Sequence, residues 1–179
     1  MKGTVQKKTI GLVPFGAVSK DFLEEIGTEL KKCVPIEYVI LPSIPVPQLA
    51  YDSKRRQYNS RIFLDQLKRR EAPIQHIIGV TDCDLFTPKW SFVFHESDIV
   101  LGIGVFSMKR LPSEYYGKIP DAKIFSSRVL TEMIHVLGHI HGLHHCKNPY
   151  CVMYFSTAID DTDRKGHQFC QDCQKKMGA

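Results

Sequence analysis

The sequence predicts an α/β or α+β fold, and three features of its pattern lead to that prediction. Short apolar segments of strand length alternate with longer amphipathic segments through the first half of the chain. One long helical pattern then runs over residues 124–141, and a loop-rich, cysteine-rich tail follows it. Strands that alternate with helices are typical of a sheet covered by helices.

The first segments each have a clear period. Residues 9–16 form a continuous apolar run that ends in a turn, which predicts a buried strand. Ser19 or Asp21 can cap the helix that follows, whose apolar residues recur at spacings of three and four. Residues 36–41 predict a second strand, and the proline-rich residues 42–47 predict a loop.

The middle of the chain predicts one more helix and three more strands. Residues 51–70 fit a charged helix with Ile62, Phe63 and Leu67 facing inward. Strands are expected at residues 74–80, 92–96 and 99–106. The long helix then presents one apolar face, and irregular backbone is expected beyond Gly142.

Composition limits the class of protein. The 179 residues suffice for one domain, which we expect to form two lobes at about residues 1–142 and 143–179. No apolar run reaches the roughly 18 residues of a membrane span, and the charged N-terminus leads into a predicted strand rather than a signal peptide. A cytoplasmic location and a monomer are the simplest expectations. The net charge of +5 comes without a nucleic-acid-binding motif, so nucleic acid is not an expected partner.

Three histidines at the end of the long helical pattern are spaced for metal binding. His135 and His139 are four residues apart, so both project from one face of a helix. Gly142 can adopt the left-handed conformation that ends a helix, and the turn would return His145 toward the pair. Three neutral imidazoles leave an open fourth position on tetrahedral zinc, as a catalytic site requires.

Four cysteines near the C-terminus predict a second, structural zinc site. They are Cys146, Cys151, Cys170 and Cys173. Four thiolates complete a closed tetrahedral site, which would order a tail with little apolar content of its own. A redox pair in the terminal C-x-x-C is the weaker alternative, because no thioredoxin-like strand and helix precede it.

The other histidines and cysteines of interest are expected to be structural. His141 and His144 point away from the metal-binding pair in a helical arrangement. Cys33 and Cys83 stand alone, and we expect both to be small buried apolar residues.

The histidine pattern resembles that of the metzincin metallopeptidases, whose motif is H-E-x-x-H-x-x-G-x-x-H. Those enzymes also carry a methionine in a tight turn beneath the metal, and Met153 is the matching residue. A cysteine beside the third histidine, a C-x-M turn and a terminal C-x-x-C make residues 124–173 similar to the archaemetzincin family.

This resemblance implies a compact metzincin-like fold with two Zn²⁺ ions per chain. A twisted mixed sheet with backing helices would lie over an active-site helix, and zinc would staple the C-terminal lobe. An exposed edge strand, which we expect at residues 99–106, would align a peptide or protein substrate by backbone hydrogen bonds.

The resemblance fails at Val136, where the motif has its glutamate. That glutamate takes a proton from the attacking water and delivers it to the leaving amine, and such assistance is worth about 10²- to 10⁴-fold. Glu132 shares the helix face, but it lies one turn away, about 6 Å along the axis. We expect Glu132 to pair with Arg128 or to support a ligand rather than to act as the base.

Three functional interpretations follow. The first is a zinc metallopeptidase of the archaemetzincin family whose activity is weak or absent. The second is a zinc-dependent module of the same fold that binds peptides without cutting them. The third is that valine has been introduced at position 136 of an active peptidase.

Overall fold

A five-stranded mixed sheet forms the centre of the molecule. The computed structural model describes residues 8–70 and 74–177, and the strand order is β2-β1-β5-β9-β8. Four strands run parallel and the last, β8, runs antiparallel to β9. The strands are β1 (Lys8–Pro14), β2 (Ile36–Ile40), β5 (His76–Thr81), β8 (His95–Asp98) and β9 (Ile103–Ser107).

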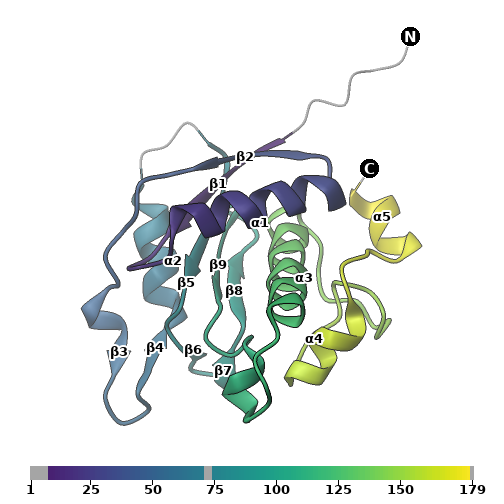
Figure 1. Cartoon of the computed structure of the whole chain (residues 1–179). Coiled ribbons are helices and arrows are strands. Elements are labelled where there is room, and N and C mark those ends of the chain that lie inside the picture. The colour runs from purple at the N-terminus through teal and green to yellow at the C-terminus, as the bar shows by residue number, and fades with distance from the viewer. Residues whose placement is uncertain (1–7, 71–73, 178–179) are drawn as a thin grey trace.

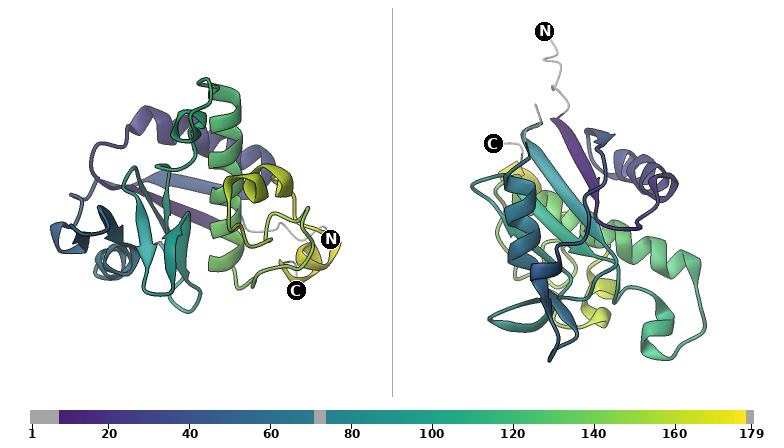
Figure 2. Two further views of the ribbon diagram at one scale, coloured as in Figure 1. Left: turned by 90° about the horizontal axis from the view of Figure 1, so that it is seen from below. Right: turned by 90° about the vertical axis from the view of Figure 1, so that its left-hand side faces the viewer.

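Helices cover both faces of this sheet, as Figures 1 and 2 show. On one face lie α1 (Lys20–Cys33), whose N-cap is Ser19, and the long helix α3 (Ala122–Ile140), whose N-cap is Asp121. On the other face lies α2 (Ser60–Lys68). Neighbouring residues such as Leu12 and Val13 therefore pack into different clusters, which explains why the central strands are continuously apolar.

A smaller four-stranded sheet of order β3-β4-β6-β7 adjoins α2. Its strands are β3 (Tyr51–Asp52), β4 (Gln57–Asn59), β6 (Leu85–Thr87) and β7 (Trp90–Val93). Single turns of 3₁₀ helix precede β3, at Gln48–Ala50, and α3, at Ser113–Tyr116.

The predicted helix over residues 51–70 is wrong in its first half. The Asp52 carboxylate accepts hydrogen bonds from the amides of Lys54 and Arg55, and Arg56 adopts a positive φ of 56°. This side-chain capping closes the β3–β4 hairpin, so α2 begins only at Ser60.

The predicted edge strand is also wrong. Residues 103–107 form β9, which lies between β5 and β8, and β8 is the edge. Both strands pack against α2 and α3, but β9 also has a neighbouring strand on each side and is fully buried, whereas β8 has only one and is half-buried.

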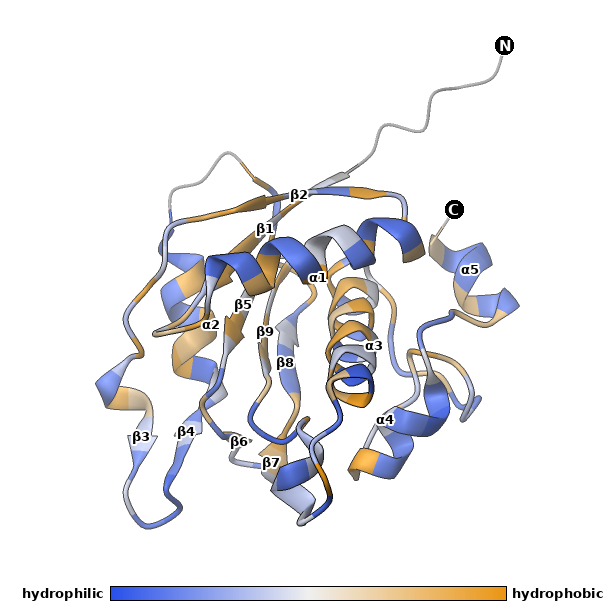
Figure 3. Cartoon of the chain, in the orientation of Figure 1, coloured by the Kyte–Doolittle hydropathy of each residue, from blue (hydrophilic) through white to orange (hydrophobic). Residues whose placement is uncertain are grey.

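The tail beyond Gly142 is mostly irregular, as expected, but contains two short helices. These are α4 (Ile159–Lys165) and α5 (Gln171–Met177). Figure 3 shows the contrast between the largely apolar α3 and the polar surfaces of α4 and α5. Cys33 is exposed at the end of α1 and Cys83 is partly buried, so the expected burial is wrong for the first and only partial for the second.

None of the helices in the described part of the chain is long and apolar enough to cross a membrane.

Candidate metal centres

The structure brings the three predicted histidines together at the end of α3. His135 and His139 lie one helical turn apart, Gly142 has a φ of +91°, and the chain then returns to His145. The Nε2 atom of His139 lies 2.9 Å from Nε2 of His135 and 3.2 Å from Nε2 of His145. Zinc–nitrogen bonds of typical length in a tetrahedron place ligand nitrogens about 3.3 Å apart, so the three imidazoles fit one zinc ion.

Backbone carbonyl groups fix the orientation of two of these rings. His135 Nδ1 donates to the carbonyl oxygen of Val152 at 2.6 Å, and His139 Nδ1 donates to that of Leu143 at 2.8 Å. A proton on Nδ1 leaves the Nε2 lone pair available for a metal, which is the usual outer arrangement of histidine ligands.

Burial also keeps the three imidazoles neutral. It lowers the pKa of His135 well below its ordinary value, and nearby cationic groups lower it further. The same causes lower the pKa of His139 to about 3 and that of His145 to about 4. Metal binding therefore needs no deprotonation of these rings near pH 7.

A fourth histidine, His95 of edge strand β8, joins the cluster. One ring nitrogen from each of His95, His135, His139 and His145 lies within 4.8 Å of the others. The ring centroids of His95 and His135 are 4.5 Å apart. Sequence analysis did not find His95, because a lone histidine in a strand carries no spacing signal. The only clue is strand alternation, which places residues 95 and 97 on one face of the sheet.

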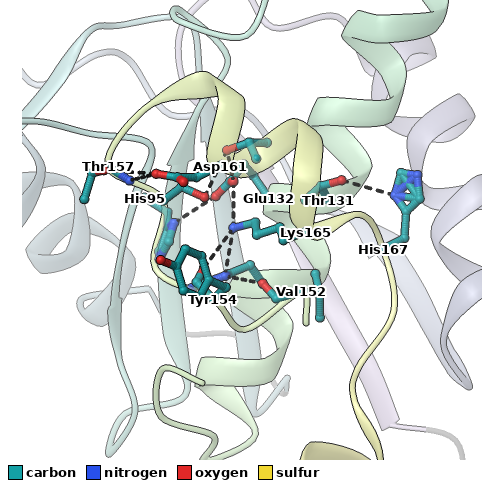
Figure 4. Close-up of polar contacts among 12 residues, drawn as sticks. His95, Thr131, Glu132, Val152, Tyr154, Thr157, Asp161, Lys165 and His167 are labelled. Carbon is teal, nitrogen blue, oxygen red and sulfur yellow. Dashed lines mark hydrogen bonds and ion pairs between the residues drawn. The ribbon is translucent and has the colours of Figure 1, made fainter. Parts of the chain in front are cut away.

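Glu132 lies at the centre of a buried polar network that supports the histidines (Figure 4). Its carboxylate contacts Lys165 Nζ at 2.9 Å, Thr162 Oγ1 at 2.8 Å and His95 Nδ1 at 3.2 Å. Burial alone would raise the pKa of Glu132, but Lys165 and His95 lower it to about 2. The expected pairing with Arg128 is wrong, because that guanidinium is bound by Asp163 from α4 and by the carbonyl of Leu111.

Lys165 is one of the functional residues that sequence reasoning missed. It comes from α4, and its fully buried ammonium group lies 3.0 Å from His135 Nδ1 and 3.4 Å from the carbonyl oxygen of Tyr154. Because Nδ1 carries the proton given to Val152, the contact with Lys165 is a close approach of two donors. The anionic Glu132 between Lys165 and His95 balances the buried positive charge.

Val136 faces the sheet in an apolar contact. It is fully buried, and a Cβ atom at Gly104 of β9 would lie 2.5 Å from its Cγ1. Gly104 thus allows α3 to approach the sheet at this point. The hydroxyl of Ser97 lies at the same place, 3.1 Å from that Cβ position, and is buried without a hydrogen-bond partner among the described residues.

The two nearby carboxylates, those of Glu132 and Glu96, are both engaged with other side chains. Glu132 lies one turn from Val136, is completely buried and is bound by three partners. Glu96 belongs to the opposite face of β8, where it accepts a hydrogen bond from Ser60 of α2.

Met153 lies directly beneath α3. A turn closes between the carbonyl of Cys151 and the amide of Tyr154 at 2.8 Å, and Met153 within it is fully buried. A Cβ atom at Gly138 would approach the Met153 sulfur to 2.2 Å, so only glycine fits at position 138 without displacement. The methionine and the helix are therefore in contact at Gly138, directly before His139 and three residues after His135.

The four cysteines form a separate cluster. Their sulfur atoms all lie within 4.8 Å of one another, and those of Cys146 and Cys170 are 3.8 Å apart. Tetrahedral zinc–thiolate geometry requires about 3.8 Å between sulfurs, so the cluster fits one ion. The amide of Cys170 donates to the sulfur of Cys151, and the backbone amide of Cys173 is the main cause that lowers the pKa of Cys170 to about 7. All four thiols are free.

His141 and His144 lie outside the four-histidine cluster. His141 Nδ1 donates to the carbonyl of Leu137 and its ring packs on His76, while His144 is exposed.

A cleft of about 660 Å³ opens beside the histidines. Edge strand β8 and the turn before β7 form one side, and His139, His145 and Phe155 lie on the other. Trp90, the only tryptophan of the chain, is half-exposed and packs on Phe155, whose ring in turn packs on His145. The cleft therefore combines a strand edge that has no neighbouring strand among the described residues, an aromatic wall and imidazole nitrogens that are placed to bind a metal.

A helix bearing two histidines, a third histidine beyond a glycine turn and a buried methionine below them define the metzincin class of zinc metallopeptidase folds. The sequence pattern of Peptidase family M54 matches residues 17–179, and archaemetzincins are similar to this chain over most of its length. The chain belongs to this family, the archaemetzincins.

Individual relatives are similar to this chain in sequence and in structure. The archaemetzincin of Pyrococcus furiosus is 38% identical over 173 residues, which cover 93% of this chain and 90% of that protein. The crystal structure of the Archaeoglobus fulgidus archaemetzincin in complex with malonate superposes with a TM-score of 0.80 at 34% identity, covering 94% of this chain and 99% of that one. A zinc-dependent peptidase from Methanocorpusculum labreanum superposes with a TM-score of 0.82 at 28% identity, with 94% and 99% coverage.

Proposed function

We propose that this chain is a zinc-binding archaemetzincin whose hydrolysis of peptide bonds is weak or absent. One observation carries the proposal. The histidines converge with the spacing that zinc requires, yet the side chain beside them at position 136 is a valine packed against Gly104.

Zinc at His135, His139 and His145 would supply Lewis-acid activation of water and of a peptide carbonyl. The chain's own residues account for the other requirements only in part. Carbonyl groups orient the ligands, and the cleft can hold an extended peptide along β8. Val136 cannot hold a proton, so the position that carries the proton to the leaving amine in the family motif cannot do so here.

We assign the second zinc ion to Cys146, Cys151, Cys170 and Cys173, which gives two ions per chain. Its role is structural, because four thiolates leave no position for water or substrate. The ion would join the segment after His145 to the Met153 turn and to α5, since the cysteines come from all three.

A zinc-dependent peptide-binding module is the second candidate. The cleft favours it, because the strand edge, Trp90 and Phe155 are all present although the base is missing. The partner would be a peptide or an unfolded protein segment. We place the chain in the cytoplasm, since a reducing compartment keeps its six cysteines out of disulfides, and we propose that it is a monomer.

The direct test compares zinc-loaded parent protein with Val136→Glu on a mixed peptide library. Val136→Glu should raise the rate of zinc-dependent cleavage about 10²-fold or more, which is the usual contribution of general acid–base catalysis. Val136→Gln is the matched control, because glutamine has nearly the same shape as glutamate but does not act as a general base. Rapid cleavage by the parent that is abolished in Glu132→Gln would contradict the proposal and make Glu132 the base.

Binding without cleavage is measured on the same proteins. Trp90 fluorescence should change when an extended peptide enters the cleft of the zinc-loaded parent, and it should not change after zinc is removed. An unchanged signal with every peptide would reject the binding module.

A further inference from the structure

We propose that His95 is a fourth protein ligand of the zinc ion at the histidine cluster. The site would then be closed by four imidazoles rather than open to water. This inference rests on the zinc binding proposed above and specifies the chemistry of the same site.

The four histidines lie close enough together to share one ion. The four ring nitrogens lie within 4.8 Å of one another, whereas tetrahedral coordination needs about 3.3 Å. The difference of at most about 1.5 Å is within the reach of a ring rotation about the side-chain bonds of His95. His95 comes from the sheet, whereas His135 and His139 come from α3, so the four rings reach the cluster from different elements.

Glu132 orients the imidazole ring of His95. Glu132 Oε2 lies 3.2 Å from His95 Nδ1, so a proton on Nδ1 is held by the carboxylate and Nε2 is left with its lone pair. A carboxylate that accepts from the remote nitrogen of a histidine is the usual support of a zinc ligand. His135 and His139 have equivalent acceptors in Val152 and Leu143.

The carboxylate of Glu132, which supports His95, is itself held by other side chains. Lys165 and Thr162 hold the other oxygen of Glu132, and both Glu132 and Lys165 are fully buried. Figure 4 shows His95 and Lys165 on either side of Glu132. A surface histidine without a metal needs no such buried and charge-balanced support.

The position of His95 in the cleft also favours a role as a ligand. His95 lines the same cleft as His139 and His145, and its side chain is only 12% exposed. It therefore borders the cleft through which water or a peptide would approach the histidines. A site that is closed in the resting protein agrees with weak or absent hydrolysis, and the gain expected for Val136→Glu requires His95 to give up its position on the ion to water.

A closed site would also join β8 to α3 through the metal. The edge strand that borders the cleft would then be ordered by zinc. Peptide binding along β8 would depend on the metal even without any contact between peptide and metal.

The test uses full-length protein with Co²⁺ in the histidine site and zinc kept in the cysteine site. Cobalt affinity is measured by competition with a chelator, and acetohydroxamate is added as a probe of an open coordination position. We expect His95→Ala to lower the affinity at least about 10²-fold, since even loss of a ligand's supporting group costs 10- to 100-fold. We also expect acetohydroxamate to change the visible spectrum of His95→Ala but not that of the parent.

His144→Ala is the matched control, because His144 lines the same cleft outside the cluster. It should change neither reading. A cooperative thermal unfolding transition like that of the parent shows that a variant is folded. If His95→Ala does not fold, X-ray absorption at the cobalt edge of the parent decides, with four imidazoles expected rather than three.

Results that contradict the role of His95 differ from results that contradict zinc binding by the histidines. A parent spectrum that responds to acetohydroxamate, a His95→Ala affinity within about threefold of the parent, or three imidazoles in the absorption spectrum would overturn the role of His95 alone. Failure of the parent to take up metal at the histidines would overturn the proposed zinc function as well.

Discussion

The ammonium group of Lys165 lies 2.9 Å from Glu132 Oε1, and both side chains are completely buried. The two residues are 33 positions apart and join α4 to α3 directly behind the histidine cluster. A buried pair of this kind contributes little by its mere presence, but removing one partner leaves an uncompensated charge. The Glu132–Lys165 contact therefore controls both stability and the orientation of His95.

Lys165→Met should destabilise the protein by about 3–5 kcal/mol in denaturant unfolding. The effect should depend on pH. Glu132 has a folded-state pKa of about 2, below its ordinary value of 4.5, so its stabilising contribution is complete above about 4.5 and is lost as the pH falls toward 2. Loss of Lys165 raises the folded-state pKa, so acid unfolding should begin at a higher pH. Lys175→Met on exposed α5 is the control, and an equal effect of both variants would contradict the assignment.

Cys170→Ser should loosen the C-terminal lobe and leave the central sheet intact. Removing one of four thiolates weakens a site whose binding energy also stabilises the fold. Hydrogen exchange should become faster in residues 146–153 and in α5, and remain unchanged in β1 and β5. Cys33→Ser, at an exposed position on α1, should change nothing. Unchanged protection of the tail would show that the cysteines do not bind a structural metal.

His139→Ala should remove the zinc ion of the histidine site and leave the zinc ion of the cysteine site in place. The histidine and cysteine clusters share no residue, so the loss of one ligand leaves the other set complete. Elemental analysis after dialysis against a weak chelator should fall from two zinc ions to one. Simultaneous loss of both ions would mean that the two sites form one cooperative unit.

Gly138→Ala should cost about 1–3 kcal/mol, the usual range for overpacking a filled core. The added methyl group meets the sulfur of Met153, so the damage should be smaller once that sulfur is gone. In a double-mutant cycle with Met153→Ala, we expect a coupling of about 0.5–3 kcal/mol. Strictly additive effects would show that Gly138 and Met153 are not in contact.

The two clusters of candidate metal ligands were predictable because their signal is local. His135, His139, Gly142 and His145 follow from helix periodicity and one turn, and the cysteines follow from their number and spacing. The order of elements follows from apolar periodicity in the same way. Asp52 shows the limit of such patterns, since its side chain diverts a helical pattern into a hairpin.

The parts that were missed depend on tertiary pairing. Whether residues 103–107 are central or at an edge is decided by which strand pairs beside them, and local sequence does not contain that information. His95 and Lys165 are each a single residue in an ordinary strand or helix, 37 and 33 positions from Glu132. Only the folded chain places them beside the histidines.

The effect of Ser97→Ala tests whether a glutamate at position 136 would form a hydrogen bond with the Ser97 hydroxyl. In the parent its hydroxyl is buried beside Val136 and has no hydrogen-bond partner within residues 8–70 and 74–177, so Ser97→Ala should be neutral or stabilising by up to about 1 kcal/mol. In Val136→Glu the new carboxylate extends from the same contact and can accept from that hydroxyl. Ser97→Ala should then destabilise by about 1.5–3 kcal/mol, the range for a hydrogen bond to a charged group. Denaturant unfolding of the four proteins measures this change of sign, and the rate of peptide cleavage should fall with the same substitution only in the glutamate background. Equal effects of Ser97→Ala in both backgrounds would place the glutamate elsewhere and would remove the hydroxyl from any role in positioning it.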